Sequence, residues 1–201
     1  MKKLPDEIIP LTVTSPPYGN MRTYGKKDFR YEWDEFTSIA QQLARITMVG
    51  GMICWVLRNQ IRNKQENCQA EREKMYFVDK LGLRAFQTII GVPTGCPITN
   101  RRHGRYVSNF DYIYVLSKGD PRHVELLRDK PNKCAGKIKN ERKVREADGT
   151  ERVACAGDYE IAKFGYRTNV WSYNTGGGHT ATDDHISKDA REFGRGFDCQ
   201  L

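Results

Sequence analysis

In the first half of the chain, apolar residues recur at helical spacing in some segments and form continuous runs in others. This arrangement predicts alternating helices and strands. Two segments, 33–49 and 70–81, place apolar residues at every third or fourth position, and this spacing predicts amphipathic helices. We expect Gly50-Gly51 to end the first helix and Gly82 to end the second. Continuous apolar runs of strand length, typical of buried strands, lie at 8–14, 52–57, 86–92 and 110–116. This order predicts an α/β fold whose last two strands form a hairpin.

The regular pattern ends after Gly119. Residues 118–152 contain eleven Lys or Arg and seven Asp or Glu, with few periodic apolar positions. Such a composition predicts a charged, loop-rich segment rather than a packed layer. Aromatic residues return over 159–173, and a triple glycine at 176–178 and a polar tail follow. The second half therefore adds a basic appendage to the α/β part.

Charge and composition narrow the class of partner. The chain has 201 residues, of which 38% are hydrophobic, and its formal net charge is +8. The apolar fraction is low for one compact domain but lies above the disordered range. An excess of Lys and Arg over Asp and Glu favours a polyanionic partner, and nucleic acid fits this charge better than an anionic membrane surface does. A solvated basic surface without such a partner explains the charge equally well.

Targeting and redox features favour the cytoplasm. No stretch approaches the roughly 18 apolar residues of a membrane span, and the segment Met1–Glu7 lacks the apolar core of a secretion signal. The six cysteines are scattered without a Cys-x-x-Cys pair. The sequence therefore predicts neither a zinc site nor a disulfide framework. We expect reduced thiols, no bound metal and no attachment to a membrane.

A rigid turn, Ser15-Pro16-Pro17-Tyr18, ends the first predicted strand. In an open α/β sheet, ligands bind beyond the carboxyl ends of the strands. The two prolines remove two N–H donors and fix two φ angles, so the carbonyls of Ser15 and Pro16 become rigid acceptors. The Tyr18 ring offers a stacking face. Together they suit a planar heterocycle with an exocyclic amino group, while a plain stiff turn and a polyproline ligand are alternative interpretations.

The motif order of the chain resembles that of the S-adenosylmethionine-dependent DNA amino-methyltransferases, which act on cytosine N4 or adenine N6. The turn at Ser15–Tyr18 resembles their catalytic motif, and only this motif is specific by itself. Segments that match later motifs in order are 33–36, 50–57, 101–106, 110–119 and 165–171. The resemblance covers roughly residues 4–189. It implies a circularly arranged subtype, in which the catalytic motif precedes the cofactor motifs.

The chain departs from the family pattern near its end. Family members continue into a His-Pro-Ala-x-Phe-Pro element and a glycine-rich turn that cradles the cofactor, whereas this chain has Ala190–Gly196 there. The resemblance therefore implies a methyltransferase truncated before the cofactor glycine motif. We expect a partial Rossmann-like methyltransferase sheet with a basic, loop-rich target-recognition segment. The expected parts are the catalytic-motif part (1–118), the target-recognition segment (119–160), and a return segment with a polar tail (161–201).

The resemblance also implies roles for individual residues. The catalytic residues would be Ser15, Pro16, Pro17 and Tyr18, and Thr14 and Ser15 would contact S-adenosylmethionine. Serine at position 15 favours cytosine N4, with adenine N6 as the alternative. The basic residues assigned to double-stranded DNA are Arg101, Arg102, Arg105, Lys130, Lys133, Lys137, Lys139, Arg142 and Lys143. A restriction endonuclease, a complementing chain and a second copy are further candidate partners.

Two other functions compete with an active DNA methyltransferase. An inactive or split DNA-binding fragment would keep the base-binding turn and the basic segment but would not hold the cofactor by itself. An RNA or protein-glutamine methyltransferase is less favoured, because related motifs in those enzymes more often carry asparagine before the prolines. Cofactor binding by the chain alone separates the first two.

Overall fold

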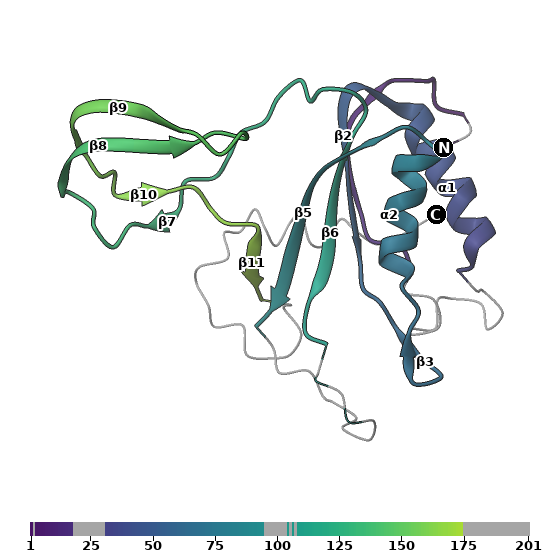
Figure 1. Ribbon diagram of the computed structural model, residues 1–201. Coiled ribbons are helices and arrows are strands. Elements are labelled where there is room, and N and C mark those ends of the chain that lie inside the picture. The colour runs from purple at the N-terminus through teal and green to yellow at the C-terminus, as the bar shows by residue number, and fades with distance from the viewer. Residues whose placement is uncertain (2, 18–30, 95–103, 105, 107, 175–201) are drawn as a thin grey trace.

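Figure 1 shows a sheet with helices on one face and a β-rich arm that projects beyond the edge of the sheet. The computed structural model describes residues 1, 3–17, 31–94, 104, 106 and 108–174. The arm begins after β6 (Asp111–Ser117), the fourth strand of the sheet along the chain, and it ends where the chain enters β11 (Val170–Tyr173), the last strand of the sheet. The strands of the arm form sheets of their own, and the arm is attached to the five-stranded sheet at both of its ends.

Five strands form the sheet in the order β1-β2-β6-β5-β11. Their bounds are Ile9–Thr14 (β1), Thr47–Leu57 (β2), Asp111–Ser117 (β6), Arg84–Pro93 (β5) and Val170–Tyr173 (β11). β1 runs parallel to β2 and β11 runs parallel to β5, whereas β6 pairs antiparallel with both β2 and β5. β1, β2, β5 and β11 thus end at one side of the sheet, which we call the carboxyl edge. The sheet and its helices confirm the predicted α/β class, and the β5–β6 pair confirms the predicted hairpin.

Two helices, α1 (Trp33–Ile46) and α2 (Gln69–Asp79), pack against the same face of the sheet. Their apolar stripes surround Trp55 of β2, which is 1% exposed. The ring centroid of Trp55 lies 6.0 Å from that of Phe36 on α1 and 5.3 Å from that of Phe77 on α2. Trp55 lies two residues before the end of β2. The aromatic core therefore packs against the helical face of the sheet close to the carboxyl edge.

The predicted end of the first helix is wrong. The helix ends at Ile46, residues 47–49 already belong to β2, and the glycine pair lies inside that strand. Gly50 has a φ of +80°, and a Cβ on Gly51 would lie 3.0 Å from the carbonyl oxygen of Pro10. The register between β1 and β2 shifts at this level. Gly50-Gly51 therefore allows a close approach between two strands instead of ending a helix.

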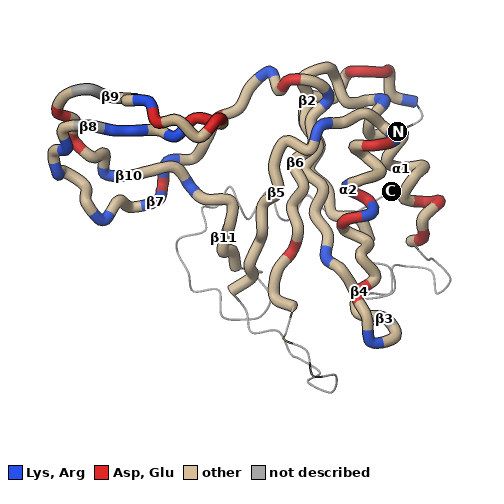
Figure 2. The backbone as a smooth tube through the Cα atoms, in the orientation of Figure 1, with Lys and Arg blue, Asp and Glu red and all other residues tan. Residues whose placement is uncertain are grey.

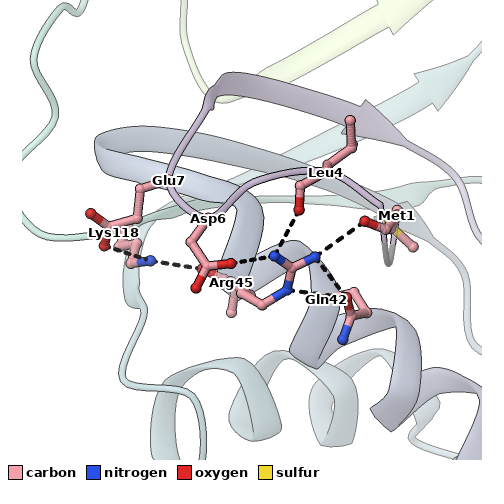
Figure 3. A network of polar contacts seen from close by, with 8 residues as sticks. Met1, Leu4, Asp6, Glu7, Gln42, Arg45 and Lys118 are labelled. Atoms are coloured by element: carbon pink, nitrogen blue, oxygen red, sulfur yellow. Dashed lines mark hydrogen bonds and ion pairs between the residues drawn. The ribbon is translucent and has the colours of Figure 1, made fainter.

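The chain that leads into β1 is fastened to α1 (Figure 3). The Arg45 guanidinium donates to the carbonyl oxygen of Leu4 at 2.9 Å and pairs with the carboxylate of Asp6. Next to it, the ammonium of Lys118 pairs with Glu7 at 3.1 Å. These contacts join α1, the segment before β1 and the residue after β6. They fix the start of β1 and so the place where its carboxyl end emerges.

The arm, residues 119–169, contains two antiparallel strand pairs instead of the predicted loops. The strands are β7 (Lys130–Pro131), β8 (Ile138–Arg145), β9 (Glu151–Glu160) and β10 (Phe164–Gly165). β8 pairs with β9, and β7 pairs with β10. Most side chains of the arm are exposed. Because neither face of the β8–β9 hairpin is buried, its sequence lacks the alternation from which strands are predicted.

The base of the arm is held by Arg167, which precedes β11. Its backbone N–H donates to the carbonyl oxygen of Leu127 at 2.9 Å, and the Nε and Nη2 atoms of its guanidinium both donate to the carboxylate of Asp129. The guanidinium also lies 5.3 Å from the ring centroid of Trp171 on β11. Hydrogen bonding to Arg167 lowers the pKa of Asp129. The outgoing and returning chains of the arm are thus joined directly before the sheet.

Short connections complete the described fold. A short hairpin links β2 to α2. It consists of two strands of two residues each, β3 (Ile61–Arg62) and β4 (Gln65–Glu66). Among the described residues, no helix has the length and apolar character needed to cross a bilayer.

Candidate active site

The predicted catalytic turn lies at the carboxyl edge of the sheet. Thr14, the last residue of β1, pairs in register with Trp55 of β2, and Ser15, Pro16 and Pro17 follow without regular secondary structure. Ser15 is exposed, Pro16 is buried and Pro17 is half-buried. The alternation of β1 therefore continues into the turn, with Pro16 facing inward and Ser15 facing outward. Tyr18 lies outside the described residues.

An ion-paired cluster occupies the same edge, between β2 and β11. Arg58 follows β2, and its Nε and Nη2 donate to the two carboxylate oxygens of Asp111 at 2.8 and 3.1 Å. The Tyr173 hydroxyl donates to Asp111 Oδ2 at 2.6 Å. The Asp111 side chain is 11% exposed, and that of Arg58 is 23% exposed. The cluster joins three strands that are far apart in sequence.

A buried carboxyl group lies beneath the edge, on the helical face. Glu73 of α2 is 1% exposed and accepts hydrogen bonds from Trp55 Nε1 and Gln69 Nε2, each at 2.7 Å. Burial raises the pKa of Glu73 to about 7, although both hydrogen bonds act in the opposite direction. Burial also raises the pKa of the nearby Tyr31 hydroxyl, which has no hydrogen-bond partner among the described residues. Glu73 is thus the described carboxyl group whose charge changes near neutral pH.

The predicted cofactor contacts, Thr14 and Ser15, both lie at this edge. Thr14 is half-buried, and the exposed Ser15 is accessible to a ligand. A nucleotide cofactor also needs a glycine turn between a strand and a helix. The glycine-rich stretches 176–178 and 193–196 lie outside the described residues, and no described strand leads through such a turn into a helix. The described residues therefore include both predicted cofactor contacts but no glycine turn of this kind.

The predicted DNA contacts divide into two groups. Arg101, Arg102 and Arg105 lie outside the described residues. The others are exposed and lie together on the arm, and they are Lys130, Lys133, Lys137, Lys139, Arg142 and Lys143. Figure 2 shows basic residues along β8 with acidic residues close by. The structure thus gathers the second group on one projecting element, far along the chain from Ser15.

The arm also encloses a hollow of about 470 Å³ that sequence reasoning did not anticipate. Its lining includes Arg128, Arg142, Tyr159, Phe164 and Tyr166. The Arg128 guanidinium lies over the Tyr166 ring at 4.3 Å from the centroid and also donates to the Tyr166 hydroxyl. The hollow therefore combines aromatic rings and basic side chains, which are groups that contact bases and phosphates, with the carboxylate of Glu160.

Sequence reasoning missed Glu73 and the Arg58 cluster. A signal for Glu73 existed, because it shares a helical face with Ala70 and Phe77, and all three are buried. A carboxylate on an apolar stripe is a candidate for a shifted pKa. Arg58 was detectable only as a polar residue directly after a buried strand. Its partners Asp111 and Tyr173 required the tertiary structure.

Comparison with known proteins assigns the chain to a family. A family model described as DNA methylase (N6_N4_Mtase) matches residues 9–191. The chain belongs to this DNA methylase family. It is 33% identical over 172 residues to the orphan methyltransferase M.BamHII of Bacillus amyloliquefaciens. That match covers 85% of this chain and 62% of M.BamHII, so the chain spans less than two thirds of that relative.

One solved structure supports the methylase fold. The chain is similar to the PvuII DNA methyltransferase (cytosine-N4-specific), with a TM-score of 0.56 and 13% sequence identity over 90% of this chain and 55% of that chain. A second match is the M1.HpyAVI–SAM complex, with a TM-score of 0.40 and 15% identity over 65% of this chain and 50% of that chain. The PvuII similarity confirms the predicted Rossmann-like methyltransferase sheet. The chain spans about half the length of these two enzymes.

Proposed function

We propose that the chain supplies the catalytic turn and the DNA-binding arm of a methyltransferase that modifies the exocyclic amine of a DNA base. Membership in the DNA methylase family supports this chemistry. The observation that carries the proposal is the turn after β1, where Pro16 is buried and Ser15 is exposed at the carboxyl edge. A turn anchored in this way can present fixed acceptors to a ligand beyond the edge.

The proposed chemistry uses the turn as a pair of acceptors. An exocyclic amine is a poor nucleophile, because its lone pair is delocalised into the ring. The Ser15 side chain and the Pro16 carbonyl would accept its two hydrogens and favour a more tetrahedral nitrogen. Tyr18 would stack on the base, which must first leave the duplex. S-adenosylmethionine supplies the electrophilic methyl group, and the contribution of the chain is positioning rather than covalent catalysis.

Cytosine N4 is the proposed target atom. Serine at position 15 and the similarity to a cytosine-N4-specific methyltransferase both favour it. Adenine N6 is the alternative within the same family. Product analysis of methylated DNA tests the choice: N4-methylcytosine supports the proposal, whereas N6-methyladenine without N4-methylcytosine overturns it.

Ser15→Ala tests the role of the turn. The variant loses one acceptor of the amine, so the methylation rate should fall about ten-fold or more. Ser38→Ala on the exposed side of α1 is the matched control and should keep the rate of the unchanged chain. Equal rates for Ser15→Ala and Ser38→Ala would contradict the proposed role of Ser15.

The arm is the proposed site of DNA binding. The exposed lysines around β8 would neutralise phosphates, so the logarithm of the affinity should fall linearly with the logarithm of the salt concentration. Replacing both Lys137 and Lys139 by glutamine should reduce that slope by about 1.8, at about 0.9 per phosphate contact. Lys80→Gln, at the end of α2, is the control. An unchanged slope in the double variant would favour a merely solvated arm.

S-adenosylmethionine is the proposed cofactor, and the alternative function is a chain that binds DNA but holds no cofactor alone. No described strand leads through a glycine turn into a helix, and the match covers 62% of M.BamHII, so cofactor binding by the chain alone needs a direct test. Calorimetric titration separates the two. Cofactor binding by the chain alone supports an independent enzyme, whereas binding only after addition of a chain with the glycine motif supports a split one.

The cellular setting completes the proposal. We propose a cytoplasmic location for the chain, because the proposed substrate is DNA and the family match supports a DNA methylase. A restriction endonuclease that recognises the same DNA site and a second copy of the chain are proposed partners. Sedimentation analysis with and without DNA measures the oligomeric state, and cleavage protection of methylated DNA identifies a matching endonuclease.

A further inference from the structure

Arg58 directly follows β2, the strand next to the one that leads into the catalytic turn. Thr14 and Trp55 are register partners in parallel strands, and three residues further along each chain come Pro17 and Arg58. The two residues therefore leave the sheet at the same edge. Any nucleotide whose base reaches Ser15 must bring its sugar and phosphate across this edge.

Among the described residues, only part of the hydrogen-bonding capacity of the Arg58 guanidinium is used. Arginine has five N–H donors, and the side-on pair with Asp111 engages Nε and one hydrogen of Nη2. No described residue accepts from the remaining three. The side chain is 23% exposed, so part of it is open to solvent. A guanidinium held along one side by a carboxylate still offers the paired donors of its other side to anionic oxygens.

The orientation of Arg58 is fixed by a row of residues across the sheet. Tyr173 on β11 reaches over β5 to Asp111 on β6, where its hydroxyl donates at 2.6 Å. The row passes Gly91 of β5, where an added Cβ would lie 3.0 Å from Tyr173 Cε1. Because glycine has no Cβ, the tyrosine ring can pack directly over the backbone of β5 at this position. Asp111 is thereby held in place, and it holds Arg58.

We propose that Arg58 binds a backbone phosphate of the target nucleotide, with Asp111 and Tyr173 as positioning residues. The inference rests on the proposed DNA methylation and adds a phosphate contact at the carboxyl edge, separate from the basic residues of the arm. A fixed side chain loses little conformational entropy on binding, so it suits exact placement of one phosphate better than the exposed lysines of the arm. Arg58 therefore positions the nucleotide while the arm contributes general affinity.

Salt-dependent DNA binding by the full chain tests this role. Arg58→Gln should weaken binding roughly ten-fold and reduce the salt slope by about 0.9, the value for one phosphate. Arg58→Lys keeps the charge and should retain the slope with weaker binding. Tyr173→Phe should weaken binding a few-fold without changing the slope. Arg84→Gln is the matched control, because Arg84 also pairs with an aspartate but lies at the start of β5, at the opposite edge; its slope should stay unchanged.

The outcomes separate this inference from the proposed function. DNA binding by the unchanged chain with equal slopes for Arg58→Gln and Arg84→Gln overturns the phosphate contact only. An unchanged slope together with lost S-adenosylmethionine binding also overturns it and assigns Arg58 to the cofactor carboxylate. Absence of DNA binding by the unchanged chain overturns the proposed function itself. Thermal unfolding of each variant verifies that the compared proteins are folded.

Discussion

Glutamine in place of Glu73 should stabilise the fold at pH 8 much more than at pH 5. Glu73 is 1% exposed and lies between Trp55 and Gln69, which both donate to its carboxylate. Burial in the aromatic core disfavours the charged form and raises the pKa of Glu73 from 4.5 to about 7. Glutamine has nearly the same shape and never carries the charge, but its NH2 group cannot accept the second hydrogen bond, a loss that is the same at both pH values.

The sign of the effect follows from proton binding. The Glu73 carboxyl has a pKa near 4.5 in the unfolded chain and about 7 in the folded one. Between these values the folded state binds more protons, so the free energy of unfolding falls as the pH rises through this window and then levels off. At about 1.4 kcal/mol per pKa unit, the whole loss is about 3 kcal/mol. The part between pH 5 and pH 8 is about 2.5 kcal/mol.

Urea unfolding followed by tryptophan fluorescence at pH 5 and pH 8 measures this difference. The advantage of Glu73→Gln over the unchanged chain should be about 2.5 kcal/mol larger at pH 8 than at pH 5. Glu66→Gln replaces an exposed carboxylate of β4 and serves as the control, with no such change between the two pH values. If Glu73→Gln shows the same relative stability at both pH values, the assignment of a raised pKa is refuted.

Two further predictions concern the sheet and its entry segment. Gly91→Ala places a Cβ 3.0 Å from the Tyr173 ring, so the free energy of unfolding should fall by about 1–3 kcal/mol. A second change, Tyr173→Ala, should remove most of the added penalty, and purely additive losses in urea unfolding would argue against the clash. Arg45→Ala removes donors to Leu4 and Asp6, which should cost about 1–2 kcal/mol. It should also speed hydrogen exchange at the Ile8 amide, which donates to Ile46; unchanged exchange would contradict the anchoring role of Arg45.

The sheet and helices were predictable because they are buried on at least one side. The runs that became β2, β5 and β6 are apolar because helices and neighbouring strands cover them. The hairpin β8–β9 was not predicted. Both of its faces are exposed to solvent, so its strands need no alternating apolar residues from which a strand could be predicted. Its turn did carry a signal, since Asp148-Gly149 is typical of hairpin connections and Gly149 has a φ of +86°.

The sequence predicted the turn of the candidate site but not the residues that surround it in the folded chain. The turn Ser15–Pro17 is contiguous, so its rigidity and its place after a strand could be inferred directly. Asp111 lies 53 residues from Arg58 and 62 residues from Tyr173. No local pattern relates positions so far apart, and their meeting depends on the order of strands in the sheet. Glu73 needed the same information, because its pKa depends on the packing around Trp55.

The arm is an insertion between two strands of one sheet, and this arrangement has a consequence for how such proteins diverge. It starts after Ser117 of β6 and ends before Val170 of β11, so both of its attachment points are fixed by the sheet. Doubling the length of a loop between fixed ends costs only about 0.6 kcal/mol. Lineages can therefore lengthen, shorten or exchange the arm while the sheet beneath it persists. The length of the arm can therefore vary without any change in the strands that place Ser15 and Arg58 at the carboxyl edge.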